Sequence, residues 1–216
     1  MLLLGLDNAG KTSILLQMKE QTFMPSAVPT IGLNIEQVEF EGFLMTFWDV
    51  GGQAVKLWKH YFDSIDGIMY VIDSTDKERL LKSRDELHKI SRDAALAHVP
   101  FLIMVNKTDL VDKRMSAQEI QSKLDLEVLK ADRIVHVQEC SALESQGIWQ
   151  GLQTLTKTMS EKVTVAVKGT DHQVVLTGGT ASVRGAASAS TRTGASVATD
   201  SQKPKEGGTP ANKELS

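Results

Sequence analysis

The chain has 216 residues, with 24 basic and 27 acidic side chains and a formal net charge of −3. That length is enough for one well-filled α/β core with additional sequence. The near balance of charge gives no basic footprint for a nucleic acid, so we expect no nucleic-acid partner. The single cysteine, Cys140, excludes a disulfide within the chain, and we expect a reducing, cytoplasmic location.

The sequence shows none of the usual signals for membrane attachment. No apolar run approaches the ~18 residues needed to span a bilayer, and the start MLLLG lacks the basic and long apolar parts of a signal peptide. Leu2 in place of glycine excludes N-myristoylation, and the final KELS carries no cysteine for prenylation. We therefore expect no direct membrane anchor, and a monomer that reaches membranes only through a partner.

Short apolar runs alternate with helical patterns up to about residue 161. Strands are predicted where β-branched and aromatic residues gather, at Leu2–Gly5, Asn34–Phe40, Phe43–Asp49, Gly67–Asp73, Phe101–Asn106 and Ile134–Cys140. Helices are predicted at Lys11–Glu20, Asp76–Ala97, Ser116–Leu124 and Gln146–Met159. The tight turn at Glu41-Gly42 predicts one antiparallel strand pair, while the other connections require β-helix-β crossovers. The prediction is therefore an α/β fold with a mostly parallel, doubly wound sheet.

The composition changes after Lys162. Residues 163–216 are dominated by Gly, Ala, Ser, Thr and Val, contain no Phe, Tyr or Trp, and carry 6 basic and 4 acidic side chains, against 18 and 23 over residues 1–162. Such a segment buries too little apolar surface to offset its ordering entropy. We predict a globular domain over 1–162 and a disordered tail over 163–216, with short strands at VTVAV and QVVLT as the less favoured alternative.

A glycine-rich loop lies between the first predicted strand and the first predicted helix. Its sequence, GLDNAGKT, matches the phosphate-binding pattern G-x-x-x-x-G-K-[ST]. The glycines let the backbone approach a phosphate closely, and the N–H groups at the helix start favour an anion. Lys11 would neutralise the β- and γ-phosphates, and Thr12 would give its hydroxyl to Mg²⁺. The candidate phosphate-binding residues from this loop are Gly5, Asp7, Asn8, Ala9, Gly10, Lys11, Thr12 and Ser13.

A second motif, NKTD at residues 106–109, predicts which base is bound. The Asp109 carboxylate can accept hydrogen bonds from N1–H and the exocyclic amine of guanine, whereas adenine would leave it unpaired at a cost of about 1–3 kcal/mol. Asn106 can tie this loop to the phosphate loop, and the Lys107 stem can lie over the base. Further along, CSAL offers a backbone N–H, at Ser141 or Ala142, to the guanine carbonyl oxygen. The predicted ligand is GTP or GDP.

The segment between these motifs contains candidates for the γ-phosphate chemistry. WDVGGQ, residues 48–53, puts Asp49 at the end of a strand, where it can hold Mg²⁺ through water. Gly52 can give its N–H to the γ-phosphate, and Gln53 can orient the attacking water. Upstream, the hydroxyl of Thr30 could complete the Mg²⁺ shell only when a γ-phosphate is present. These parts predict a switch in which two loops order with GTP and relax with GDP.

The sequence resembles the Arf and Arf-like branch of the Ras-type small GTPases over about residues 1–160. The motifs GLDNAGKT, VPTIG, WDVGGQ, LWKHYF, VIDSTDKER, NKTDL and CSAL recur in order, and Asp7 and Trp48 favour Arf over Ras, Rab or Rho. The resemblance implies a P-loop small G domain that uses Mg²⁺ and GTP to regulate membrane traffic or a related cytoplasmic assembly. It implies exchange factors, activating proteins and effectors as partners. It also implies effector contact at Trp48 and Tyr61, with Leu33 where the family usually has Phe.

Three features depart from the family pattern. The family carries an amphipathic helix before the first strand, so either the start is truncated or the protein works without that helix. The segment between Gln53 and LW is shorter than usual, and the tail has no counterpart. Because no arginine finger is apparent in cis, we expect slow intrinsic hydrolysis. The alternative is a GTP-dependent binding module with little or no hydrolysis, and a metabolite kinase is less favoured because it leaves NKTD unexplained.

Overall fold

The computed structural model describes residues 1–20, 30–53 and 55–168, and its centre is a six-stranded sheet. The strands are β1 (Leu2–Leu4), β2 (Leu33–Phe40), β3 (Phe43–Val50), β4 (Ile68–Asp73), β5 (Phe101–Asn106) and β6 (Val135–Glu139). Their spatial order is β2-β3-β1-β4-β5-β6. The β2–β3 pair is antiparallel, and the other neighbouring pairs are parallel. The predicted α/β fold with one antiparallel pair is confirmed.

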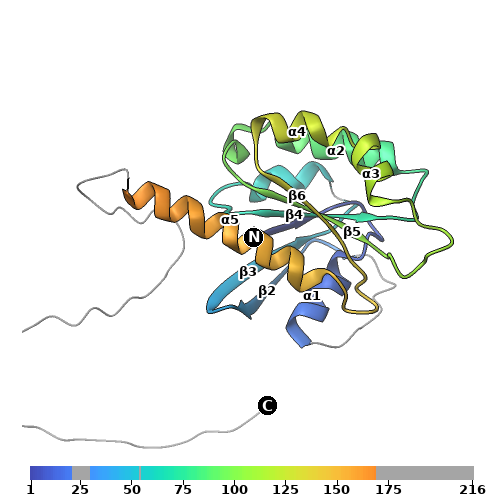
Figure 1. Ribbon diagram of the computed structural model, residues 1–216, viewed down its shortest axis with the longest axis horizontal. Helices are drawn as coiled ribbons and strands as arrows, with labels where there is room; N and C mark the ends of the chain where they lie inside the picture. Colours follow the sequence, from blue (N-terminus) through green and yellow to red (C-terminus); the bar gives the residue numbers. More distant parts are fainter. Residues whose placement is uncertain (21–29, 54, 169–216) are drawn as a thin grey trace, which may run out of the picture. The chain divides into compact units, whose positions relative to one another are not determined.

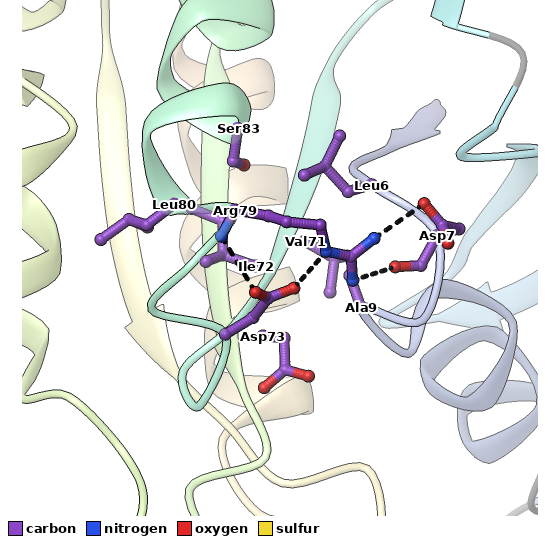
Figure 2. Close-up of a pocket in the computed structure, with 10 residues that line it drawn as sticks. Leu6, Asp7, Ala9, Val71, Ile72, Asp73, Arg79, Leu80 and Ser83 are labelled. Carbon is purple, nitrogen blue, oxygen red and sulfur yellow. Dashed lines mark hydrogen bonds and ion pairs between the residues drawn. The ribbon is translucent and has the colours of Figure 1, made fainter.

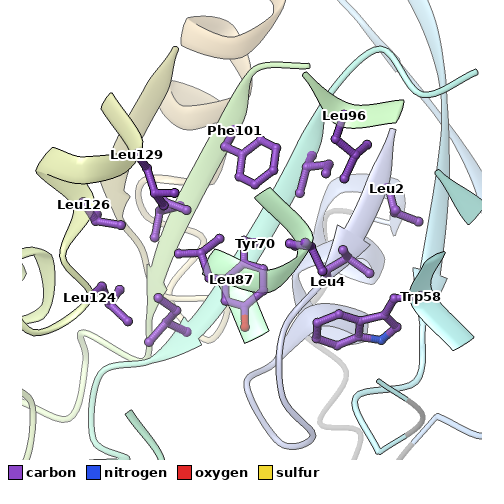
Figure 3. Close-up of a cluster of buried hydrophobic side chains, with 14 of the residues drawn as sticks. Leu2, Leu4, Trp58, Tyr70, Leu87, Leu96, Phe101, Leu124, Leu126 and Leu129 are labelled. Carbon is purple, nitrogen blue, oxygen red and sulfur yellow. The ribbon is translucent and has the colours of Figure 1, made fainter. Parts of the chain in front are cut away.

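Helices cover both faces of this sheet, as Figure 1 shows. On one side lie α1 (Lys11–Glu20) and α5 (Ile148–Lys168), and on the other lie α2 (Leu80–Ser91), α3 (Ala117–Lys123) and α4 (Leu126–Asp132). In β4, Ile68, Tyr70 and Ile72 join the hydrophobic cluster on the α2 side, while Met69 and Val71 join the cluster on the α1 side. Because both faces are buried, the central strands are continuously apolar rather than alternating. Figure 3 shows part of the first cluster, including Tyr70 and Trp58.

The long helix predicted over residues 76–97 is shorter than expected. It is α2, Leu80–Ser91, followed by a short 3-10 helix, η2 (Ala94–Leu96). At either end an aspartate side chain accepts a backbone N–H: Asp76 Oδ1 from Arg79 (3.1 Å) and Asp93 Oδ1 from Ala95 (3.0 Å). Such local hydrogen bonds give the backbone an alternative to the helix ladder, and they mark its boundaries here.

Two short helices were not predicted, and one predicted helix is longer than expected. The 3-10 helix η1 (Val55–Tyr61) and α4 each span seven residues, and α4, unlike the predicted α3, has no side-chain cap hydrogen bond at its start. Helix α5 continues to Lys168, so the predicted boundary at 162 falls inside it and VTVAV is helical rather than a strand. The rest of the predicted tail, 169–216, lies outside the described residues, and its disorder stays a prediction.

The described residues belong to one compact unit, Met1–Gly178. A second unit, Gly179–Ser216, lies wholly outside the described part of the chain. In the described ranges, no helix is both long enough and apolar enough to cross a bilayer.

Candidate functional site

The glycine-rich loop connects β1 to α1 at the carboxyl end of the parallel strands, where such sheets bind ligands. Asn8 lies in the left-handed region at φ 63°, and Gly10 has φ 92°. A Cβ on Gly10 would collide with the side-chain amide of Asn106, so this position requires glycine both for its conformation and for its space. The loop therefore closes tightly over residues 5–10, and α1 begins directly after it at Lys11.

Lys11 is the only lysine of this loop, and its side chain is 5% exposed. Its Nζ donates to the carbonyl oxygens of Gly5 (2.9 Å) and Leu6 (3.0 Å). Burial lowers the pKa of Lys11 to about 8, although Asp49 and Asp7 act in the opposite direction. An ammonium group held by neutral carbonyls in a buried loop would gain from an anion, because charge-assisted hydrogen bonds are stronger than neutral ones.

Three oxygen-bearing side chains meet beside this loop. The Thr12 hydroxyl donates to Asp49 Oδ2 (2.6 Å) and lies 2.8 Å from the Thr30 hydroxyl. Asp49 is fully buried, and its other oxygen, Oδ1, has no hydrogen-bond partner among the residues that the structure describes. Burial raises the pKa of Asp49, opposed by the Thr12 hydrogen bond and the charge of Lys11. An unpaired buried carboxylate oxygen is costly, so Oδ1 would gain from a hydrogen-bond donor or a cation.

The same cluster fits Mg²⁺ in its chemistry. Mg²⁺ prefers oxygen ligands, commonly one or two carboxylates with hydroxyls, waters and phosphate oxygens. In the part of the chain that the structure describes, no group of three or more His, Cys, Asp or Glu side chains could hold a metal ion. The candidates therefore remain Thr12, Thr30 and Asp49, as the sequence predicts, with Oδ1 of Asp49 free to accept from a metal-bound water.

The segment after β3 lies directly against the phosphate loop. A Cβ on Gly52 would collide with the backbone nitrogen of Asp7, and a Cβ on Gly51 would collide with the carbonyl oxygen of Thr30. Gln53 follows with its side chain exposed, and η1 begins at Val55. Ala54, in the shortened segment, lies outside the described residues. The predicted γ-phosphate residues Gly52 and Thr30 are therefore brought to the phosphate loop, and Gln53 is the exposed residue that follows Gly52.

Asn106, at the end of β5, joins the phosphate loop to the base-binding loop. Its side-chain nitrogen donates to the carbonyl oxygen of Ala9 (2.9 Å), and its Oδ1 accepts from the backbone N–H of Ala142 (3.0 Å). The side chain is 1% exposed. The tie between the two loops that the sequence predicts is present, and it reaches the CSAL segment as well.

Asp109 is held in place by Ser141. The Ser141 hydroxyl donates to Asp109 Oδ1 (2.6 Å), which leaves the other carboxylate oxygen available. Sequence reasoning assigned a backbone N–H of Ser141 or Ala142 to the guanine carbonyl. In the structure the Ser141 N–H donates to Gln146 (3.0 Å) and the Ala142 N–H to Asn106. Ser141 therefore contributes through its hydroxyl, as a residue that positions Asp109.

Lys107 lies in the left-handed region at φ 67°, and its Nζ forms an ion pair with Asp73 Oδ2 (2.7 Å). Asp73, at the end of β4, is 8% exposed and was not predicted as a site residue. This ion pair fixes the far end of the Lys107 stem, the part predicted to lie over the base. Asp73 lies in the VIDSTDKER segment, but its contact depends on the register of β4 with β5, where it lies opposite Asn106.

Sequence reasoning also gave no role to Arg79, which contacts the phosphate loop. Figure 2 shows its guanidinium beside Asp7 of the loop, and its Nε also donates to Asp76 Oδ2. The motif VIDSTDKER contains this arginine, but 72 positions separate it from Asp7, so the contact is visible only in the fold.

The aromatic side chains expected to meet effectors also lie together. The rings of Trp48 on β3 and Tyr61 in η1 meet edge to face with centroids 5.9 Å apart. Leu33, at the start of β2, packs against the same hydrophobic cluster and is half-buried.

Several known proteins are similar to this chain in sequence and fold. The model of the ADP-ribosylation factor family matches residues 1–159. ADP-ribosylation factor J of Dictyostelium discoideum is 38% identical over 163 residues, covering 74% of this chain and 85% of that protein. ADP-ribosylation factor-like protein 3 of Chlamydomonas reinhardtii is 41% identical over 158 residues, covering 72% and 88%. The solved structure of the Arl6 BBS3 small GTPase of Trypanosoma brucei with bound GppNp is 30% identical, with a TM-score of 0.67, covering 74% of this chain and 96% of that one.

Proposed function

Because the chain belongs to the ADP-ribosylation factor family of small GTPases, we propose that it is a Mg²⁺-dependent switch that binds GTP and GDP and hydrolyses GTP slowly. The observation that supports this most is the cluster of Thr12, Thr30 and Asp49 beside the phosphate loop, in which one buried carboxylate oxygen has no partner in the described part of the chain. The GppNp in the related Trypanosoma structure supports a guanine nucleoside triphosphate as the ligand.

Each half of the site has a separate task in this proposal. Lys11 leaves the carbonyl oxygens of Gly5 and Leu6 and binds the β- and γ-phosphates. Mg²⁺, when bound, neutralises charge on those phosphates. Asp109 accepts from the amine and N1–H of guanine with the oxygen that Ser141 leaves available, and Asn106 keeps the base-binding loop in register with the phosphate loop.

Slow intrinsic hydrolysis follows from the groups near the phosphate loop. Gln53 orients the attacking water, but its side chain is exposed in this structure and has to turn inward. Arg79 contacts the phosphate loop, but its guanidinium is held by Asp7 and Asp76. An arginine finger supplied by a partner is worth ~10³–10⁵ in rate, so an activating protein would control turnover.

The cellular role that we propose is regulation of membrane traffic or of a related cytoplasmic assembly. Membership of the family supports it, with an exchange factor, an activating protein and effectors as partners. The Trp48–Tyr61 pair, with Leu33 nearby, is the proposed effector surface. The protein acts as a monomer in the cytoplasm, and it meets membranes through a partner.

Single-turnover GTP hydrolysis by the wild type and a Gln53→Leu variant tests the switch. We expect slow but measurable hydrolysis in the wild type, and a further loss in Gln53→Leu with GTP affinity unchanged. The exposed Gln53, with η1 beginning at Val55, favours one alternative, a GTP-dependent binding module. Equal, negligible rates in both proteins, with tight GTP binding, would establish that alternative.

A further inference from the structure

Asp7 places a carboxylate inside a loop that is built for anions. It lies two residues after Gly5, and the backbone of Gly52, our candidate for γ-phosphate contact, lies directly against its nitrogen. Like charges at such short range repel, and the repulsion grows where water is excluded. A triphosphate therefore meets a negative charge in its own binding loop unless that charge is offset.

Arg79 contacts Asp7 at two points. Its Nη1 forms an ion pair with Asp7 Oδ1 (3.0 Å), and its Nη2 donates to the carbonyl oxygen of Asp7 (3.2 Å). The side chains of Arg79 and Asp7 are 34% and 29% exposed, so the pair is partly shielded from water. Figure 2 shows the Asp7 carboxylate directed toward the start of α2, where Arg79 lies.

Arg79 is itself held firmly. Its Nε donates to Asp76 Oδ2 (2.6 Å), and its backbone N–H donates to Asp76 Oδ1 (3.1 Å). Arg79 is also the residue immediately before α2, so its backbone is fixed by the helix start. One guanidinium therefore bridges the carboxylate of the phosphate loop, its backbone carbonyl and a second carboxylate.

We propose that Arg79 is a positioning residue for nucleotide binding, which holds the Asp7 carboxylate toward α2 and offsets its charge so that the loop accepts a triphosphate. The inference rests on the proposed nucleotide site. Arg79, in the turn before α2, would therefore influence the choice between GTP and GDP. An unpaired Asp7 carboxylate would repel GTP more strongly than GDP, because GTP carries the extra negative charge of the γ-phosphate.

A double-mutant cycle with equilibrium GTP and GDP titrations tests this role. We expect Arg79→Ala to weaken GTP about tenfold and GDP clearly less, with the loss shrinking at high salt. Adding Asp7→Asn should restore GTP affinity to within about twofold of the wild type, because the repelling charge is gone. Arg84→Ala, an arginine of α2 whose partners are Asp85 and Asp125, is the matched control and should change neither affinity.

If Arg79 only held α2 and the phosphate loop together, without offsetting the charge of Asp7, the affinities would follow a different pattern. Arg79→Ala would then weaken GTP and GDP equally, and Asp7→Asn would give no rescue, which would overturn the proposal. Thermal unfolding identifies a variant that fails to fold, and Asp7→Asn alone then decides: it should bind GTP at least as tightly as the wild type, and weaker binding would refute the inference. If the wild type binds no guanine nucleotide, the proposed function itself fails.

Discussion

At the phosphate end of the site, Asp49 keeps a buried oxygen that no described residue pairs, and Lys11 is held by two neutral carbonyls. At the base end, Asn106 bonds both Ala9 and Ala142, and Ser141 already holds Asp109. Both ends are built from loops that follow strands of the same sheet. They differ in how completely their polar groups are paired before any ligand is bound.

This difference divides two tasks between the two ends. A prepaired loop costs little to order on binding, so the base end can select guanine rigidly. At the phosphate end, the unpaired or weakly paired charges of Asp49 and Lys11 can exchange their present contacts for contacts with a ligand. The phosphate end can therefore adopt two states. The contrast predicts that variants at the phosphate end change nucleotide affinity whichever base the nucleotide carries, whereas variants at the base end change which base is bound.

Lys11→Ala should give the largest effect. It removes a buried ammonium that we assign to two phosphates, and hydrogen bonds to charged groups are worth ~1.5–3 kcal/mol each. GTP and GDP affinity should both fall by at least about 100-fold in equilibrium titration. Lys19→Ala, at the exposed end of the same helix, is the control and should bind normally. Unchanged GTP and GDP affinity in Lys11→Ala would show that the phosphate loop does not bind the nucleotide.

Asp109→Asn should alter the choice of base rather than phosphate binding. GTP affinity should fall by about 100-fold, while xanthosine triphosphate, whose extra carbonyl can accept from the new amide, should gain. Asp112→Asn, an exposed neighbour in the same loop, should bind like the wild type. Competition titrations with both nucleotides measure the exchange. A variant that keeps the wild-type preference for guanine would show that Asp109 does not read the base.

The pH dependence of GDP binding should separate the two ends further. Burial lowers the pKa of Lys11 to about 8 in the free protein, and a bound phosphate raises it. Above pH 8, binding must therefore take up a proton, and GDP affinity should fall, approaching tenfold per pH unit. Titrations between pH 7 and pH 9 should show a flat region and then this decline. The GDP affinity of Lys11→Ala should show no such decline. An equal decline in both proteins would show that a group other than Lys11 causes the pH dependence.

Ser141→Ala should give the smallest effect. It removes one hydrogen bond that positions Asp109, so guanine affinity should fall by about fivefold, in line with a net worth of ~1 kcal/mol. Affinity for the phosphates alone, measured with inorganic triphosphate, should not change. Ser122→Ala, on the exposed face of α3, provides the control. A loss as large as that of Asp109→Asn would mean that Ser141 contacts the base itself.

Motifs in the sequence predicted the parts of the site that follow strand ends. Thr12, Asp49 and Asn106 lie where the alternation of strands and helices puts them, because the carboxyl ends of parallel strands meet at one edge. Two further contacts between distant segments could not be predicted in this way. The pairing of Arg79 with Asp7 and of Lys107 with Asp73 depends on where α2 begins and on strand register.

Local chemistry explains the other differences from the sequence prediction. The hydroxyl of Ser141, rather than its N–H, serves the base end because the N–H is used in the turn to Gln146. Helix α4 follows Asp125, which adopts φ 51°, and a single left-handed residue leaves no pattern in a single sequence. The break in the predicted helix over 76–97 depended on aspartate side chains that bond their own backbone.

The most direct test is an equilibrium titration of nucleotide-free protein with GTP, GDP and ATP, each with and without Mg²⁺. We expect tight GTP and GDP binding, and ATP binding weaker by at least about 100-fold. Mg²⁺ should raise the affinity for GTP more than the affinity for GDP. In Asp49→Asn the gain from Mg²⁺ should be lost while the preference for guanine stays. Equal affinity for ATP and GTP, or a wild-type GTP affinity that does not respond to Mg²⁺, would contradict these expectations.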